Sequence, residues 1–161
     1  MKVKELFIVA VAKSKSTDDY LAGDVPFVTN AEINNGIVRY VEPFDDDRVF
    51  EGPAICISGL GYATVHYGQF LPKGNGGDSC TILKPMEAVK KSGLLYYAAL
   101  FNTLHGWRFS FGRKTSRRRI ENLVMTPLLS EAPINLLVEI EANNKMMSVL
   151  LTEKEAQLRD G

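Results

Sequence analysis

The segment SGLLYYAALFNTLHG, residues 92–106, carries the clearest helical pattern of this chain. Its apolar side chains recur at helical spacing, Ser92 can cap the first turn, and Gly106 stands where a helix would end. His105, next to that glycine, suits the C-terminal end of a helix because the helix dipole favours a cationic side chain there. We therefore predict a core helix over residues 92–105.

The chain before this helix is rich in short strands. Five runs of β-branched and apolar residues are bounded by Gly, Pro, Asn or Asp, which is typical of strands. They are VPFVT at 25–29, GIVRYV at 36–41, AICIS at 54–58, YATVHY at 62–67 and CTILK at 80–84. Asn34-Asn35-Gly36 indicates a tight turn, and PKGNGG at 72–77 indicates a flexible loop. The predicted class is α/β (α+β), with a β-rich N-terminal half and one core helix.

The segment that follows the helix combines aromatic and cationic side chains. In WRFSF, residues 107–111, the three aromatic residues alternate with Arg108 and Ser110. This alternation predicts a strand whose aromatic side chains are buried and whose Arg108 faces solvent. Gly112 would end that strand.

The next segment, RKTSRRRIENL at residues 113–123, predicts a loop that leads into a short helix. Thr115 or Ser116 can cap this helix, while Ile120 and Leu123 share one helical face and would point inward. The arginines are then left outside, on neighbouring turns of one small element.

Positive charge is concentrated in this part of a chain that is neutral as a whole. The chain has 19 Lys and Arg against 19 Asp and Glu, yet residues 88–120 contain eight Lys or Arg and no acidic residue. Six of these cations lie within residues 108–119: Arg108, Arg113, Lys114, Arg117, Arg118 and Arg119. Arginines beside hydroxyls and backbone amides are typical of surfaces that bind phosphate groups. A solvated, charged turn would have the same sequence pattern.

The C-terminal segment fits two structures. An alternating spacing of three and four, as in a helical seam, runs through Leu137, Ile140, Asn144, Met147, Leu151, Lys154 and Leu158, whereas residues 134–140 alternate as in a strand. We favour the helix. With a boundary between Pro127 and Pro133, the sequence predicts one domain over residues 1–129 and a helical or hairpin tail over residues 130–161 that serves dimerisation or partner docking.

Composition bounds the class of protein. With 161 residues and 45% apolar residues, the chain can bury one core and little more. Cys56 and Cys80 lie in apolar strand-like runs, where a free cysteine behaves as a small hydrophobe, so we predict a cytoplasmic protein. The N-terminal apolar stretch is too short for a membrane span and has no convincing signal-cleavage site.

The sequence lacks the patterns of catalysis on nucleic acids. No Asp or Glu is followed two residues later by Lys, and neither Asn-Pro-Pro nor Asp-Pro-Pro is present. Ser58-Gly59-Leu60-Gly61 lies between two predicted strands, so it indicates a bend and not a cofactor loop, which would open a helix. His66 and His105 have no metal ligands at a suitable spacing, and we expect no metal site and no cofactor. We expect His66 to be exposed and able to touch a ligand.

Several local patterns occur in an order and spacing that identify a family. They are Gly23-Asp24-Val25-Pro26-Phe27-Val28-Thr29-Asn30 with Ile33-Asn34-Asn35-Gly36; Ile55, Ser58, Gly59 and Gly61; Leu83-Lys84-Pro85; and Phe109, Gly112, Arg113, Ile120, Leu123 and Pro127. Over residues 5 to 129 the chain resembles the target recognition domain of type I restriction-modification specificity subunits.

The resemblance implies a domain that inserts loops into the DNA major groove, reads one part of a split target, and directs a separate methyltransferase and nuclease. It also implies that the chain is not itself an enzyme. Specificity subunits usually carry two recognition domains joined by long helices, whereas this chain has one domain and a short tail. A half-subunit, a standalone relative and a fragment therefore remain open, and a homodimer on a palindromic target is one form.

Two groups of residues are candidates for contact with double-stranded DNA. The phosphate group comprises Arg108, Arg113, Lys114, Thr115, Arg117, Arg118 and Arg119. The base-edge group comprises Asn30, Asn34, Asn35, Tyr62, His66, Tyr67, Lys73 and Asn75. Asn suits adenine and Arg suits guanine in the major groove, although each Asn is also a turn former. Two other functions stay open: a nuclease site built from Asp24, Asp78 and Glu121, and a protein-interaction module that uses the tail and binds no DNA.

Overall fold

The computed structural model describes residues 1–110, 112–128, 142, 145–147 and 149–150. The chain divides into two compact units, residues 1–127 and residues 128–161. The first unit is an α/β domain with two four-stranded sheets, so the predicted fold class is confirmed. Among the described residues, no helix has both the length and the apolar composition needed to cross a bilayer.

One sheet is antiparallel throughout. Its strands, in spatial order, are β1 (Phe7–Val11), β8 (Thr81–Pro85), β5 (Ala54–Ile57) and β6 (Ala63–His66). β5 lies at the centre and is buried along its whole length, which explains its unbroken apolar run. The turn between β5 and β6 is closed by a hydrogen bond from the Ser58 amide to the Tyr62 carbonyl, so the predicted bend at residues 58–61 is confirmed.

The second sheet is mixed. Its order is β3 (Ile37–Val41), β2 (Ala22–Val28), β7 (Gln69–Pro72) and β4 (Phe50–Glu51), with β2 and β7 parallel. The five predicted strands are therefore all present. β1, β4 and β7 were not predicted. The short runs of β4 and β7 lie beside Gly or Pro and carry little periodic signal, and the apolar run of β1, Phe7–Val11, was weighed only as a membrane or signal segment.

The predicted core helix is confirmed as α2 (Leu94–Leu104), which follows the 3₁₀ turn η4 (Lys91–Gly93). It buries Leu94, Tyr97, Ala98 and Phe101 against β5 and β6. The predicted cap is wrong: Gly93 is the N-cap and no side chain bonds there, because η4 already orders the chain before the helix. His105 is the C-cap residue, as predicted.

The predicted strand over residues 107–111 is wrong. Residues Gly106–Phe109 form the 3₁₀ turn η5, held by a bond from the Arg108 amide to the His105 carbonyl. These local bonds satisfy the backbone, so it needs no strand partner. Phe109 is buried and stacks on Phe101, whereas Trp107 is 68% exposed. Phe111 lies outside the described residues.

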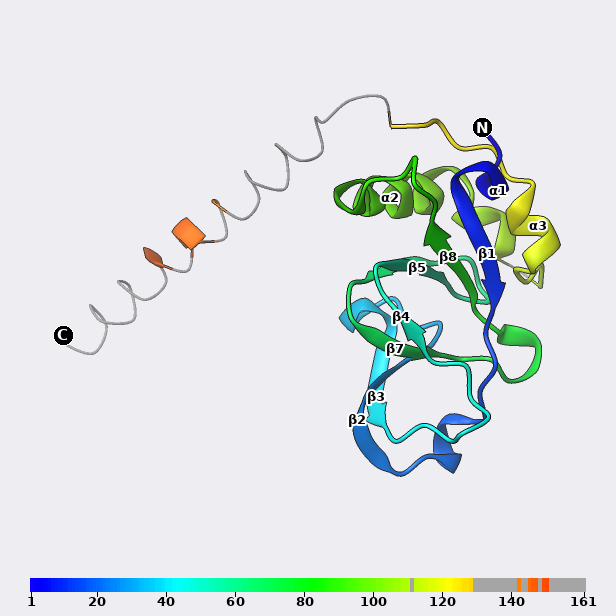
Figure 1. Ribbon diagram of the computed structural model, residues 1–161, viewed down its shortest axis with the longest axis vertical. Helices are drawn as coiled ribbons and strands as arrows, with labels where there is room; N and C mark the ends of the chain where they lie inside the picture. Colours follow the sequence, from blue (N-terminus) through cyan, green and yellow to red (C-terminus); the bar gives the residue numbers. More distant parts are fainter. Residues whose placement is uncertain (111, 129–141, 143–144, 148, 151–161) are drawn as a thin grey trace. The chain divides into compact units, whose positions relative to one another are not determined.

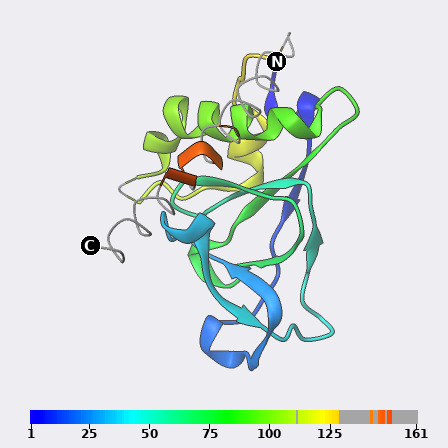
Figure 2. The same ribbon diagram turned by 90° about the vertical axis from the view of Figure 1, so that its left-hand side faces the viewer.

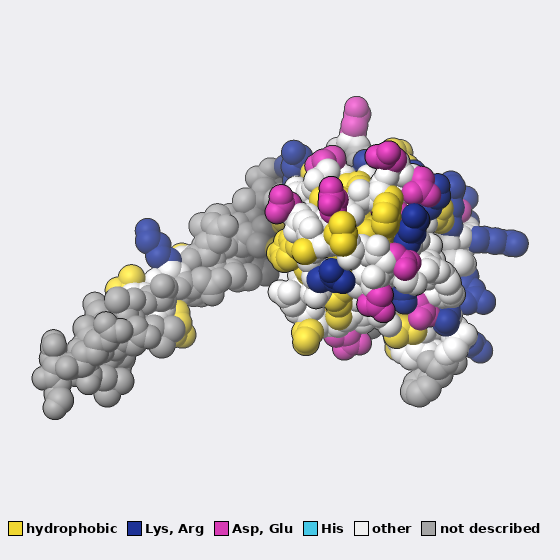
Figure 3. All heavy atoms as spheres, turned by 90° about the horizontal axis from the view of Figure 1, so that it is seen from below, with side chains coloured by type: hydrophobic (Ala, Val, Ile, Leu, Met, Phe, Trp, Pro, Cys, Tyr) yellow, Lys and Arg dark blue, Asp and Glu magenta, His cyan; other side chains and the backbone are white. Residues whose placement is uncertain are grey.

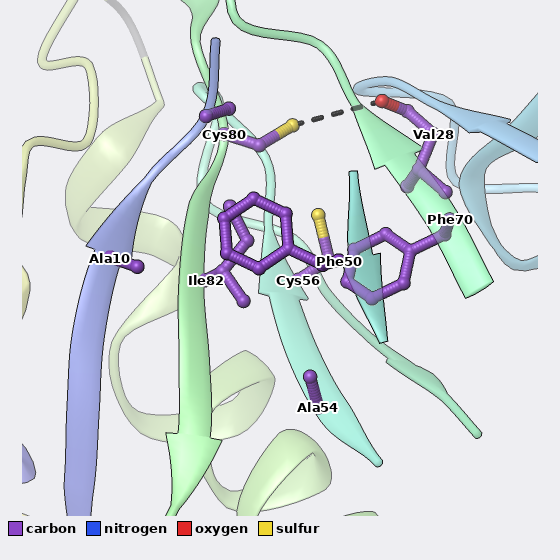
Figure 4. Packing of buried hydrophobic residues seen from close by; sticks show 9 residues of the cluster. Ala10, Val28, Phe50, Ala54, Cys56, Phe70, Cys80 and Ile82 are labelled. Atoms are coloured by element: carbon purple, nitrogen blue, oxygen red, sulfur yellow. Dashed lines mark hydrogen bonds between the residues drawn. The ribbon is translucent and has the colours of Figure 1, made fainter. Parts of the chain in front are cut away.

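Side chains from both sheets form one continuous interior. Figure 4 shows Ala54, Cys56 and Ile82 of the first sheet facing Phe50 and Phe70 of the second. The thiols of Cys56 and Cys80 are free and buried in this interior. The hydrogen bond to Cys80, together with burial, raises the pKa of the Cys56 thiol well above its ordinary value, so Cys56 stays protonated and serves as a small hydrophobe, as predicted.

The helices gather at one end of the first unit. Figures 1 and 2 both show α2 across that end, with the hairpin of β2 and β3 at the other. Two short helices, α1 (Val3–Leu6) and α3 (Arg117–Glu121), contact each other beside it. The remaining elements are the 3₁₀ turns η1 (Thr17–Asp19), η2 (Asn34–Gly36) and η3 (Gly76–Asp78). In the second unit, the described residues from 142 to 150 are helical, and the rest of the predicted tail lies outside the described residues.

Candidate nucleic-acid interface

Six cations form what we call the cationic site. They come from η5, the loop after it and α3, and are Arg108, Arg113, Lys114, Arg117, Arg118 and Arg119, all exposed. Figure 3 shows Lys and Arg side chains gathered along one edge of the first unit. The loop and short helix predicted from residues 113–123 are both present, so the arginines lie outside as expected.

The α3 segment is anchored from both sides. Ser116 is its N-cap, and the Oγ atom accepts a hydrogen bond of 3.4 Å from the Arg119 amide. Ile120 is fully buried beneath the helix, whereas Leu123 is only half-buried. An inward apolar residue and a capped first turn thus hold three consecutive arginines on the surface.

The loop before α3 is tied to the bend between β5 and β6. The Thr115 amide donates to the Gly59 carbonyl at 2.9 Å, and the Thr115 hydroxyl donates to the Ser58 carbonyl at 3.1 Å. Thr115 therefore acts first as an anchor for the cationic site, although its hydroxyl oxygen can still accept a hydrogen bond.

The cations of the site differ in how far they are already paired. Arg117 donates to the Glu121 carboxylate at 2.6 Å, and Arg119 donates to the Lys114 carbonyl at 2.7 Å. The side chains of Arg113 and Arg118 make no hydrogen bond or ion pair with any residue that the structure describes. These two guanidinium groups, like that of Arg108, which contacts only the Trp107 ring among the described residues, keep their donors for an external anion.

An exposed indole borders a pocket within the cationic site. The pocket has a volume of about 660 Å³, and Trp107, Arg108, Arg113 and Arg119 contribute to its lining. The indole N–H of Trp107 donates to the Leu104 carbonyl at 3.0 Å, and the Arg108 guanidinium lies 5.3 Å from the ring centroid. An aromatic face beside arginines can contact a base or sugar while the arginines contact phosphate.

The Asn34-Asn35-Gly36 turn has the left-handed backbone that its sequence predicts, with φ values of 50°, 53° and 76°. The amide of Asn35 donates to the Val65 carbonyl at 2.8 Å, and that of Asn34 donates to the Ile37 carbonyl at 3.0 Å. Both residues are exposed, and neither side-chain oxygen accepts a hydrogen bond from the described residues. Both side chains hold the turn and keep an acceptor for a ligand.

The expectation that His66 is exposed is wrong. Its side chain is buried, with Nε2 at 2.8 Å from the Thr64 hydroxyl and the ring stacked on Phe70 at 4.6 Å. Burial lowers the pKa of His66 to about 4, so the ring is neutral near pH 7. All four residues of β6 are buried. The polar Thr and His in the YATVHY run did not predict this burial.

The remaining base-edge candidates lie on several segments. Tyr67 and Asn75 are exposed, while Asn30, Tyr62 and Lys73 are half-buried. The amide of Asn75 donates to the Ser16 hydroxyl at 2.8 Å. Lys73 is linked to the cationic site through Asp78, since its Nζ and that of Lys114 both pair with that carboxylate.

Two of the three carboxylates considered for a nuclease site already pair with cations. Asp78 pairs with lysines, Glu121 pairs with Arg117, and Asp24 lies on β2. In the part of the chain that the structure describes, no group of three or more His, Cys, Asp or Glu could hold a metal ion.

No protein-family model and no curated protein sequence matches this chain. Solved structures do match its fold. The HsdS subunit from Thermoanaerobacter tengcongensis matches with a TM-score of 0.61 and 14% identity, covering 93% of this chain and 38% of that chain. The S subunit of a type I restriction-modification system from M. genitalium matches with a TM-score of 0.56 and 14% identity, covering 76% and 32% of the two chains.

A third match comes from a structure that addresses complex assembly and conformational transition of the type I restriction-modification system. Its TM-score is 0.63 at 16% identity, covering 99% of this chain and 42% of that chain. The chain thus spans well under half the length of the subunits it matches. It has the fold of one part of a type I specificity subunit, as a single target recognition domain would, and the predicted resemblance is confirmed at the level of the fold.

Proposed function

From this shared fold we propose that the chain is a sequence-specific module for double-stranded DNA, acting as the target recognition part of a restriction-modification system. The cationic site is the observation that carries the proposal. It presents six exposed cations on η5, the anchored loop after it and α3, and the side chains of Arg113 and Arg118 are open to an external anion. A neutral chain that concentrates its cations in this way is suited to a polyanion that touches one face.

The two candidate groups divide the work of recognition. The cationic site binds phosphates and sets the position of the protein on the duplex, which carries no sequence information by itself. The exposed and half-buried polar residues read base edges: Asn30, Asn34, Asn35, Tyr62, Tyr67, Lys73 and Asn75. His66 takes no part, because its ring is buried and already bonded to Thr64.

The module works with partners and has no catalysis of its own. We propose that it directs separate methyltransferase and nuclease subunits in the cytoplasm, and that residues 130–161 join it to them or to a second copy. The related structure concerned with complex assembly supports this part of the proposal. The carboxylate partners described above favour this reading over a nuclease.

The first test is selection of duplexes from a random pool, followed by sequencing and affinity measurements. Trp107 is the only tryptophan of the chain, so its fluorescence reports contact at the cationic site directly. Enrichment of a defined motif, with a change in Trp107 emission, is the expected result. Failure to bind any duplex at low salt would show that the cationic site is a solvated surface.

A second test addresses catalysis. The protein is incubated with supercoiled plasmid and magnesium or manganese, and the plasmid should stay intact. Nicking that a single carboxylate substitution abolishes would replace the binding module with a nuclease.

A further inference from the structure

Asp78 holds two cations that come from distant segments of the chain. Its Oδ1 lies 2.5 Å from the Lys114 Nζ, and its Oδ2 lies 3.6 Å from the Lys73 Nζ. The three side chains are between 27% and 45% exposed, so the cluster lies at the surface, with the Oδ1 atom of Asp78 itself covered. Lys114, and to a lesser extent Lys73, hold the pKa of Asp78 below its ordinary value, so the carboxylate is ionised near pH 7.

The backbone around Asp78 is built for this contact. A Cβ atom on Gly59 would lie 2.6 Å from the Asp78 Cα, so the loop of Asp78 can approach the β5–β6 bend only because residue 59 is glycine. The same Gly59 carbonyl accepts the hydrogen bond from Thr115, which follows Lys114. A Cβ on Gly77 would lie 2.9 Å from the Lys114 Nζ. Asp78 and Lys114 are therefore brought together by one shared anchor, and the ion pair is not a chance meeting of mobile side chains.

We propose that Lys73 and Lys114 form a phosphate-binding subsite, and that Asp78 occupies this subsite in the free protein as an internal substitute for a DNA phosphate. The inference rests on the proposed function, since it assigns part of the DNA contact, and it moves Lys73 from the base edges to phosphate because Lys73 shares Asp78 with Lys114. A carboxylate and a phosphate compete for the same ammonium donors, and Lys binds either as a point charge. Asp78 thereby restrains binding to any duplex, because DNA must displace the carboxylate to reach both lysines.

The experiment measures the affinity of the full chain for a selected duplex and for a scrambled duplex of the same composition. Asp78→Asn removes the charge and keeps the shape of the side chain. It should raise affinity for both duplexes, roughly threefold to tenfold at low salt, because two paired lysines become available to phosphate. Asp78→Ser is measured beside it, together with thermal unfolding, so that a folding defect in one variant does not decide the result.

Two controls separate this mechanism from a general change in charge. Asp45→Asn removes one negative charge at an exposed turn residue that forms no ion pair with the described residues, and should change affinity much less. Asp78→Asn is also introduced into a chain that carries Lys73→Ala and Lys114→Ala. There its gain should fall to the level of Asp45→Asn, because no lysine is left to release.

The outcomes are distinct. Lack of binding by both the native chain and Asp78→Asn would contradict the proposed function itself. If the native chain binds DNA and Asp78→Asn binds no more tightly than Asp45→Asn, or more weakly, only the role of Asp78 is overturned. A gain that persists without the two lysines overturns it as well.

Discussion

At the residue scale, the chemistry of the candidate interface depends on which polar groups are already satisfied. Arg117 and Arg119 have partners within their own short element, whereas the side chains of Arg113 and Arg118 have none among the described residues. The sequence analysis placed these four arginines in one cluster and gave them equal roles. The structure ranks them, because a guanidinium that must leave a partner gains less from a phosphate.

Arg113→Ala and Arg118→Ala should therefore weaken binding to selected and scrambled duplexes by the same factor. Each should reduce the slope of log affinity against log salt by about one, since one phosphate contact is lost. Lys4→Ala, an exposed cation on α1, is the matched control. Unchanged affinity and slope in both arginine variants would reduce the cluster to a solvated turn.

His66 predicts a dependence of stability on pH. Its folded pKa of about 4 lies below the value of 6.5 for a free imidazole, so only the unfolded chain binds the proton between these values. Stability linked to His66 is complete above pH 6.5 and falls as the pH drops toward 4, by roughly 3 kcal/mol in total.

Urea unfolding of the native chain and of His66→Gln, followed from pH 7 to pH 4, measures this term. As the pH falls, the native chain should lose unfolding free energy relative to His66→Gln. A difference that stays constant with pH would show that His66 is not buried in its neutral form. His66→Gln should leave base preference unchanged, since the ring does not reach the surface.

At the element scale, Asn102 protects the free edge of the first sheet. β6 is the edge strand, and the side chain of Asn102 on α2 bonds both backbone groups of Ala63: it accepts from the amide at 2.7 Å and donates to the carbonyl at 3.0 Å. The carboxamide thus imitates the backbone of a further strand. Such a side chain removes the open pairing sites that an edge strand presents.

Asn102→Ala should lower the free energy of unfolding by about 1–3 kcal/mol, because two backbone groups lose their partner. It should also increase aggregation, because the edge of β6 becomes available to other chains. Thr103→Ala, at the next and exposed position of α2, is the control and should stay within about 0.5 kcal/mol of the native chain. Equal stability of the two variants would contradict the edge role.

At the scale of the whole molecule, backbone hydrogen bonds join the beginning of the first unit to its end. The Val3 amide donates to the Leu123 carbonyl at 2.9 Å, and the Met125 amide donates to the Met1 carbonyl at 2.8 Å. Both sheets, α2 and the cationic site lie within residues 1–127. This unit therefore contains its own core and the proposed DNA contacts.

A chain that ends after Pro127 should fold with nearly the native melting temperature and keep its affinity for single half-sites. A chain that ends after Glu121 should unfold at a lower temperature, because the pairing of residues 1–3 with residues 123–125 is lost. Light scattering on the full chain and the chain that ends after Pro127 tests whether the tail makes a dimer. Loss of the fold in the chain that ends after Pro127 would show that the two units depend on each other.

The elements with a local signal could be predicted from the amino-acid order alone. The periodicity of residues 92–106, the β-branched runs and the Asn-Asn-Gly turn each predict their structure, because spacing and backbone preference act over a few neighbours. The position of α3 and its exposed arginines also followed from a cap and a single inward isoleucine. The order of motifs, compared with known specificity subunits, pointed to the fold.

Which side chains are buried, and which charges from distant segments meet, became known from the folded chain. Burial of His66 and exposure of Trp107 both depend on what other segments place beside them. The joining of Asp78 to Lys114 depends on glycines that let two loops approach. Such contacts link residues far apart in the chain, and no local pattern encodes them, because their energy exists only once the sheets have formed and their loops have met.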